Sequence, residues 1–320
     1  MNLILAGKDI LRNKRFMEYK KIFKSQSLRF KILRLLSWVP DTWMVRIQYR
    51  IKQGRWPNME HPIRYTEKLQ LYKLKYRNPI MHQCVDKLEV RKYVEQKGLS
   101  NILNRLYGVY ERAEDINFDS LPNRFVIKST SGGGGNNVIV VKDKSKLDIL
   151  KVKVTISKWL NDSTGQINAG REWAYSGISE TKIIIEEFLE EKGPDGNIRP
   201  LTDYKFFCFD GKPYYIYVVT DRNPGVSAAF GIYDMEFNKL PYYRADELRQ
   251  TTIEPRPKNY DKMIEISKVL SKGFPHVRVD LYNINGIIYF GELTFYDGSG
   301  YFQFDPDVFD EILGECFTEY

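Results

Sequence analysis

Two short turn sequences, each between two runs rich in β-branched and aromatic residues, constrain the fold most strongly. Asp210-Gly211 separates the runs KFFCF and YYIYVVT, and Asn285-Gly286 separates VRVDLYNI from IIYFGEL. Asp-Gly and Asn-Gly pairs readily adopt the left-handed conformations of two-residue hairpin turns. The sequence therefore predicts two antiparallel hairpins in the C-terminal half, which argues against a simple parallel doubly wound sheet.

Strand and helix patterns alternate upstream of these hairpins. Short apolar runs predict strands, and longer amphipathic stretches ended by Gly or Pro predict helices. We expect strands at 124–128, 137–142, 181–186 and 204–209, and helices at 65–76, 86–98 and near 146–160. Together with the hairpins, this pattern indicates the α+β class.

The chain is long enough for two closely packed domains. Its 320 residues are 42% hydrophobic and 14% aromatic, which is sufficient for a substantial core. We expect a helical basic extension at 1–60, a body at 61–314 and a short tail at 315–320. Within the body, we expect one subdomain at about 86–185 and a second at 186–314.

The positive charge is concentrated near the N-terminus. Residues 1–55 carry 14 Lys or Arg against 3 Asp or Glu, whereas the whole chain has a net charge of only +8. The run LRFKILRLLSWV at 28–39 predicts a basic amphipathic helix, which could pack on the body or lie on an anionic membrane. Nucleic acid is not an expected partner, because no recognised reading motif accompanies the basic residues.

Cysteine usage and hydropathy bear on the cellular compartment. Cys84, Cys208 and Cys316 show no metal-ligand spacing, and an odd number gives no disulfide framework. No apolar run of about 18 residues is present to cross a bilayer. We therefore expect a cytoplasmic protein, possibly located at the inner face of the membrane.

The hairpin at Asn285-Gly286 carries the sharpest chemical signal. It folds the strand of Asp280 against the strand of Glu292, so both carboxylates can point to one face. Two such carboxylates form a hard-oxygen site suited to Mg²⁺, and Thr294 projects from the same side as Glu292. Alternatively, Asp280 could form an ion pair with Arg278 on an exposed strand.

A glycine run directly after the strand 124–128 is a second candidate site. The segment is Lys128-Ser-Thr-Ser131-Gly132-Gly133-Gly134-Gly135. Its four glycines lack the Cβ atoms that would keep backbone N–H groups away from a phosphate. Lys128 would add a positive charge. The run could also be a flexible hairpin turn, and no Walker lysine is present.

A third candidate is the apolar run that ends in Glu186, Glu187, Phe188 and Leu189. At a domain hinge, it could offer backbone groups and a carboxylate to adenine and ribose. It could equally be a buried strand with two solvated acids at its end.

Further along the chain, polar residues precede a segment rich in small residues. Asp203-Tyr-Lys205 is followed by Asp221-Arg222 and by the segment 223–231. A cation followed by a mobile loop suits a site that closes over its substrate. His61, His82 and His276 are too isolated to be assigned as bases, and we expect each to be structural.

The order and spacing of these features resemble the ATP-grasp superfamily. The phrases DYKFFCFDGKP, FPHVRVDLY and YFGELTFYDGSG are similar to its TupA-like branch, which is associated with teichuronopeptide and other bacterial cell-surface polysaccharides. The resemblance covers about residues 60–314. It implies an ATP-grasp fold, in which two α+β subdomains with antiparallel sheets clamp ATP.

The resemblance also implies roles for individual residues. Lys87 and Lys128 match the phosphate-contacting lysines, and Asp280 and Glu292 match the magnesium carboxylates. The other matches are Glu186 to Leu189 for adenine and ribose, Asp203 with Lys205 facing the reacting phosphate, and Arg222 and Arg278 as transition-state candidates. Thr294 stands where many relatives have Asn, so its role as a metal ligand is an open question.

Three functions are compatible with the sequence. The resemblance favours an ATP-dependent carboxylate-amine ligase that uses Mg²⁺ and an acyl phosphate, with a uronic acid and an amine as substrates. A metal-dependent glycosyltransferase is an alternative, because Asp305-Pro306-Asp307 fits an Asp-x-Asp pattern. These acids also directly precede a helical run at 308–313, where acids commonly cap a helix. The third possibility is a non-catalytic module that binds a membrane or nucleic acid through residues 1–55.

Overall fold

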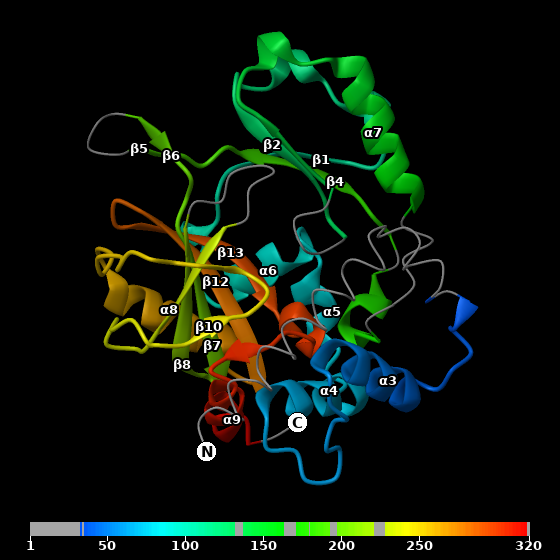
Figure 1. Cartoon of the computed structure of the whole chain (residues 1–320). Coiled ribbons are helices and arrows are strands. Elements are labelled where there is room, and N and C mark those ends of the chain that lie inside the picture. The colour runs from blue at the N-terminus through cyan, green and yellow to red at the C-terminus, as the bar shows by residue number, and fades with distance from the viewer. Residues whose placement is uncertain are drawn as a thin grey trace.

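The computed structural model describes residues 33, 35–131, 137–162, 171–178, 180–192, 197–220 and 228–318. Two β-sheets dominate this part of the chain, and helices pack on both (Figure 1). Half of the predicted helix at 28–39, namely residues 28–32 and 34, lies outside the described residues. Gly132, Gly133, Gly134 and Arg222 lie outside them as well. The described residues include no helix that is long and apolar enough to cross a membrane.

The first sheet has four strands in the order β1-β4-β2-β3, and every pair is antiparallel. Its strands are β1 (Leu106–Tyr110), β2 (Phe125–Ser129), β3 (Val138–Val141) and β4 (Ile183–Glu187). Helix α7 (Ile149–Asp162) covers one face, where Val152 and Ile156 pack with Ile127 and Ile185. The opposite face carries Lys128 and Glu186, because side chains alternate along a strand.

The second sheet has six strands in the order β11-β9-β8-β7-β12-β13. They are β7 (Asp203–Phe209), β8 (Lys212–Thr220), β9 (Ala229–Tyr233), β11 (Leu248–Arg249), β12 (His276–Ile284) and β13 (Ile287–Thr294). Both predicted hairpins are confirmed, since β7 pairs with β8 and β12 pairs with β13 in antiparallel register. All four turn residues have positive φ, from 48° at Asp210 to 97° at Gly286. Only β11 pairs in parallel among the described strands.

The two faces of the second sheet have different covers. Helix α8 (Tyr260–Ser271) packs on one face, where Tyr260 stacks on Phe206. On the other face, α4 (Tyr65–Lys75) and α9 (Val308–Glu315) cover the end of the sheet that carries Phe207, Phe209 and His276. The charged residues described below occupy the continuation of this second face.

Shorter elements complete the fold. The helices are α3 (Asp41–Gln53), α5 (Ile80–Val85) and α6 (Glu89–Gln96), and the two-residue strands are β5 (Glu191–Lys192), β6 (Ile198–Arg199), β10 (Tyr243–Arg244) and β14 (Phe304–Asp305). Helix α6 begins later than predicted, because the Asp86 carboxylate accepts from the backbone N–H groups of Leu88 and Glu89 at 2.8 and 3.0 Å. The predicted boundary between residues 185 and 186 falls inside β4.

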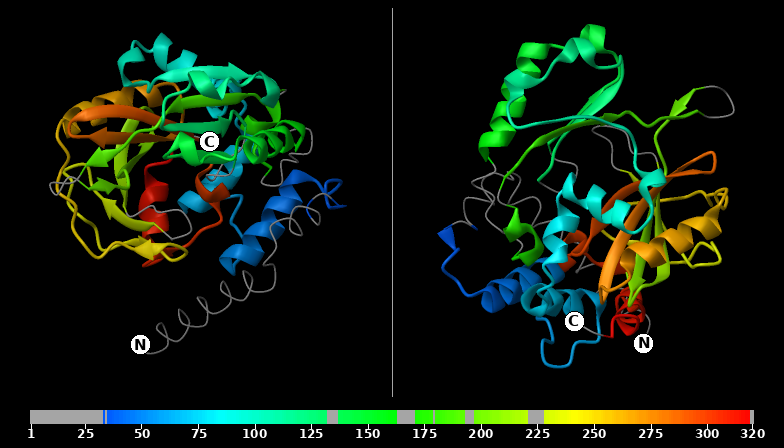
Figure 2. Two further views of the ribbon diagram at one scale, coloured as in Figure 1. Left: turned by 90° about the horizontal axis from the view of Figure 1, so that it is seen from above. Right: turned by 180° about the vertical axis from the view of Figure 1, so that it is seen from behind.

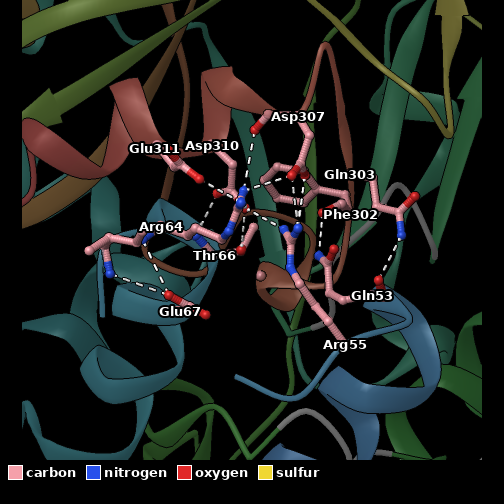
Figure 3. A network of polar contacts seen from close by, with 12 residues as sticks. Gln53, Arg55, Arg64, Thr66, Glu67, Phe302, Gln303, Asp307, Asp310 and Glu311 are labelled. Atoms are coloured by element: carbon pink, nitrogen blue, oxygen red, sulfur yellow. Dashed lines mark hydrogen bonds and ion pairs between the residues drawn. The ribbon is translucent and has the colours of Figure 1, made fainter. Parts of the chain in front are cut away.

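The N-terminal helices are joined to α9 by a partly buried polar network (Figure 3). Asp310 is buried and accepts from the backbone N–H and hydroxyl of Thr66 at 2.9 and 2.7 Å. Arg55 forms ion pairs with Asp307 and Asp310 at 2.9 and 3.3 Å, and Arg64 contacts Asp307 at 3.0 Å. Removing one partner of such a buried group would leave an uncompensated charge. The network thus connects the segment around α4 with the C-terminal helix α9.

Candidate active site

Three charged side chains form a row across the second sheet. Asp280 on β12 pairs in register with Lys205 on β7 and with Glu292 on β13. Directly opposed residues of antiparallel strands have their Cβ atoms about 4.5–5.5 Å apart on one face. The two carboxylates predicted to bind metal therefore lie next to each other on the sheet.

A β-bulge beside this row explains the glycine in the sequence Phe-Gly-Glu. The register shifts between Asp280 and Leu281, which leaves Gly291 as the extra residue of β13. A Cβ atom on Gly291 would lie 2.8 Å from the backbone oxygen of Asp280, closer than carbon and oxygen can approach without displacement. Only glycine fits here unaltered, so the bulge fixes Glu292 beside Asp280.

Asp280 is buried and held by two cations. Its carboxylate accepts from Arg278 Nε at 2.7 Å and Nη2 at 2.8 Å, and it also contacts Lys205 Nζ. Burial opposes the charge, but Arg278 and Lys205 outweigh it and lower the pKa of Asp280 to about 2. The ion pair with Arg278 that the sequence left open does form, although in the interior instead of on an exposed strand.

Lys205 remains charged despite its burial. Its amine lies 2.8 Å from Asp203 and also contacts Asp280. Burial disfavours the charge, but these two carboxylates exceed that effect and raise the pKa of Lys205 above its usual value. The predicted cation is thus a permanent positive charge on this face.

Glu292 is the accessible member of the row, with 53% of its side chain exposed. Its Oε1 accepts from Thr294 Oγ1 at 3.1 Å and from Arg278 Nη2 at 3.3 Å. Mg²⁺ is commonly held by one or two carboxylates together with substrate phosphates. Glu292 is the accessible carboxylate of this pair, because both oxygens of Asp280 are engaged by Arg278 and Lys205. Thr294 is placed to orient Glu292, because its hydroxyl also accepts from Arg278 at 3.1 Å.

Sequence reasoning missed a chain of alternating charges that continues from Arg278. Asp297 contacts Arg278 Nη1 through one oxygen and lies 3.5 Å from Arg244 Nη1 through the other. Arg244 in turn bonds Asp246 at 3.1 and 3.0 Å and stacks on Phe302, 4.2 Å from the ring centroid. These residues come from irregular segments and a two-residue strand, so no periodicity could have indicated them.

The first sheet contributes a second charged group. Glu186 is buried, and its two oxygens lie 2.7 Å from Lys128 and 3.1 Å from Arg91 on α6. It is therefore not one of two solvated acids at a strand end, which was the alternative reading of this segment. The excess positive charge of Lys128 and Arg91 over Glu186 suits an anionic ligand.

Lys87 connects the two groups of charges. Its backbone N–H donates to Thr130 at 3.0 Å, immediately beyond β2. Burial lowers the pKa of its amine; Glu292 opposes this shift and Lys128 adds to it. Helix α5 ends at Val85 and packs against β13, so Lys87 follows an element that contacts the strand of Glu292 and bonds a residue next to the strand of Lys128.

The remaining predicted residues that the structure describes lie in or next to strands β2 and β4 of the first sheet. The Ser131 hydroxyl is 2.6 Å from that of Thr181, and the Glu187 backbone N–H donates to Arg105 at 2.9 Å. Phe188 and Leu189 are half-buried directly after β4.

The Asp-x-Asp pattern occupies a different place. Asp307 precedes α9, but its side chain makes no capping hydrogen bond. It bonds Arg55 at 3.1 and 2.9 Å instead, so the expectation of side-chain capping is wrong. Asp305 lies in β14, which pairs with β10. This arrangement gives no support to the glycosyltransferase alternative.

Residues 67–318 match the family described as TupA-like ATPgrasp, and the chain therefore belongs to the TupA-like ATP-grasp family. The suspected family and the α+β fold class with antiparallel sheets are thereby confirmed.

Solved structures of low identity also match. A D-alanine–D-alanine ligase from Bacillus anthracis shares 19% identity, with 66% of this chain and 56% of that chain covered and a TM-score of 0.39. An N5-carboxyaminoimidazole synthetase from Staphylococcus aureus, solved with ADP, shares 12% identity. The match covers 77% of this chain and 55% of that chain, with a TM-score of 0.43. The chain thus spans about half the length of these proteins. No curated protein matches it.

Proposed function

We propose that the protein is an ATP-dependent carboxylate-amine ligase. A substrate carboxylate attacks the γ-phosphorus of ATP, the bond to the β,γ-bridging oxygen breaks, and an acyl phosphate and ADP form. An amine then attacks the acyl carbon, loses a proton and displaces inorganic phosphate, which leaves an amide. The position of Lys87 carries this proposal: its backbone bonds Thr130 beyond the strand of Lys128, and α5 just before it packs against β13, the strand of Glu292.

The division of charge between the sheets supports it. The first sheet and α6 present Lys128 and Arg91 against one acid, Glu186, which suits the triphosphate. The second sheet presents Asp280 and Glu292, which would hold Mg²⁺. When bound, that ion would neutralise charge on the phosphate oxygens.

The protein's own contribution is mainly positioning, because phosphoryl transfer requires little covalent chemistry from side chains. Lys205 is held between Asp203 and Asp280 and would face the transferring phosphoryl group. Arg278 and Arg222 are our further candidates for meeting its developing charge. Gly132, Gly133, Gly134 and Ser131 would approach the phosphates, and residues 186–189 would receive adenine and ribose.

The substrates are proposed from the family branch. A uronic acid of a bacterial cell-surface polysaccharide would supply the carboxylate, and an amino acid or another amine would supply the nucleophile. The cytoplasm, where ATP is available, is the expected compartment.

Trapping of the acyl phosphate with hydroxylamine tests the reaction type. The enzyme is incubated with MgATP, hydroxylamine and a panel of uronic acids and uronate oligosaccharides. We expect a hydroxamate and ADP in equal amounts with at least one carboxylate, and none without it. Glu292→Gln should abolish the signal, whereas Glu265→Gln, a matched change at an exposed ion pair on α8, should not.

Two results would overturn the proposal. Release of AMP and pyrophosphate would show an acyl adenylate instead of an acyl phosphate. Absence of carboxylate-dependent ADP release across the panel, from a protein that nevertheless transfers sugar from a nucleotide-sugar, would favour the glycosyltransferase.

A further inference from the structure

Helix α3 has apolar side chains on two opposite faces. The inward face packs on the protein through Met44, Val45 and Tyr49, each no more than 3% exposed. The outward face carries Trp43, Ile47 and Ile51 at i, i+4 and i+8, with exposures of 57%, 39% and 51%. A surface helix of a globular protein normally presents polar side chains on its outer face. We call Trp43, Ile47 and Ile51 the outer stripe.

Large exposed hydrophobic residues are concentrated around this stripe. Within residues 35–63 they also include Leu35, Trp38, Trp56 and Ile63, with exposures of 59–78%. Every highly exposed tryptophan of the described chain lies in this segment. Contiguous exposed apolar surface commonly marks an interaction site, and tryptophan favours the boundary between water and lipid.

Cations are interleaved with the stripe. Arg46 and Arg50 lie between its members on α3, and each is only partly buried. A hollow of about 420 Å³ adjoins Trp43 between α3 and α4, lined by apolar Met59, Leu71 and Leu74 and by the cations Arg46 and Lys75. An apolar recess beside two cations matches an anionic headgroup attached to a hydrocarbon chain.

The position of α3 leaves this face accessible. The helix lies at the periphery, beside α4 and away from both sheets, in all three views (Figures 1 and 2). Neither the first sheet nor α7 lies next to α3 in these views, and the side chains of the outer stripe are exposed.

We propose that the outer stripe of α3 docks on the surface of an anionic phospholipid bilayer, with the helix axis in the plane of the interface. Trp43, Ile47 and Ile51 enter the headgroup boundary, while Arg46, Arg50 and Lys75 meet phosphates. The excess of cations within residues 1–55 strengthens attraction to this class of surface over a neutral one. The inference does not depend on the proposed reaction.

Vesicle binding by the full chain tests the proposal. The triple variant Trp43→Ser, Ile47→Ser, Ile51→Ser is compared with the control Leu150→Ser, Val154→Ser. The control residues form an exposed i, i+4 pair on α7, with exposures of 79% and 55% and with lysines nearby. Partitioning is measured by co-sedimentation with phosphatidylglycerol-containing vesicles and with pure phosphatidylcholine vesicles.

We expect the triple variant to bind anionic vesicles at least tenfold more weakly than wild type, and the α7 control to bind normally. Arg46→Gln with Lys75→Gln should reduce binding to anionic vesicles and weaken its decrease with added salt. Brominated acyl chains should quench tryptophan fluorescence in wild type but much less in the triple variant. Circular dichroism and thermal unfolding verify that each variant is folded.

Other outcomes would overturn the proposal. If the folded triple variant binds like wild type, the contact is made elsewhere, for example by residues 1–32. If the triple variant instead changes the mass of the protein in solution, the stripe is an interface between two copies. Equal binding of wild type to neutral and anionic vesicles would exclude recognition of charge.

Discussion

At the residue scale, the candidate site depends on charges that hold one another in place. Arg278 forms ion pairs with Asp280 and with Asp297, and Asp297 forms a second ion pair with Arg244. Arg244 is itself fixed by Asp246 and by the ring of Phe302. Outer partners of this kind orient the groups that act directly on a substrate.

We therefore predict that Arg244→Gln lowers kcat by about 10–100-fold while the KM for ATP changes little. The expected cause is a shift of Asp297 that releases Arg278, because a single missing outer partner misplaces the group in front of it. Steady-state ADP release measures both constants. Arg256→Gln, at an exposed pair with Asp261, is the matched control and should leave both unchanged. A rise in KM with constant kcat would contradict positioning of Arg278.

The sequence predicted some residues of the site and not others for a physical reason. Asp280 and Glu292 could be paired because an Asn-Gly turn fixes the register of a hairpin, and register determines which side chains are neighbours. Asp297 and Arg244 could not be paired with them, since neither belongs to a periodic element. The three successive residues of positive φ at 298–300 follow Asp297 and have no signature beyond two glycines.

At the element scale, β12 carries a buried histidine in an aromatic cluster. Because the Cys208 carbonyl can only accept, His276 Nδ1 must carry the proton that it donates at 3.0 Å, and Nε2 then accepts from the Tyr65 hydroxyl at 3.0 Å. Burial lowers the pKa of His276 to about 3. The side chain is therefore neutral in the folded protein, in agreement with the structural role expected from the sequence.

This pKa predicts a defined loss of stability in acid. Below pH 6.5 the unfolded chain binds a proton at this histidine and the folded chain does not, so stability decreases as pH falls from 6.5 toward 3. The loss is about 1.4 kcal/mol per pH unit, or about 2 kcal/mol by pH 5. Urea unfolding of wild type and His276→Gln at several pH values measures it. Parallel pH dependences of the two proteins would show that His276 is not the source.

Some helices and strands could be predicted from the sequence and others could not. Hairpin strands with Asp-Gly or Asn-Gly turns and helix α4 could be located because local sequence determines them. The two-residue strands β10, β11 and β14 could not be, because only tertiary pairing makes them strands. Helix α6 was predicted to begin too early, since the Asp86 carboxylate precedes it and accepts from the backbone N–H groups of Leu88 and Glu89.

At the scale of the whole molecule, the proposed site draws its residues from two sheets. The two turns predicted antiparallel strands. No pattern in the sequence of either sheet predicted how the two sheets are placed relative to each other. The family resemblance supplied that expectation, and the segment of Lys87 connects the two sheets, because it bonds Thr130 beyond β2 and follows α5, which packs on β13. Residues 55–67 and 302–311, far apart in sequence, close the molecule at the other end of the second sheet.

The most direct test of this account is equilibrium binding of ATP, by calorimetry, with and without Mg²⁺. We predict that Mg²⁺ increases the affinity of wild type at least tenfold, that Glu292→Gln removes most of this increase, and that Lys128→Met weakens binding under both conditions. Glu265→Gln should bind like wild type. Absence of ATP binding by the wild-type protein, together with Mg²⁺-dependent binding of a UDP-sugar, would contradict the account.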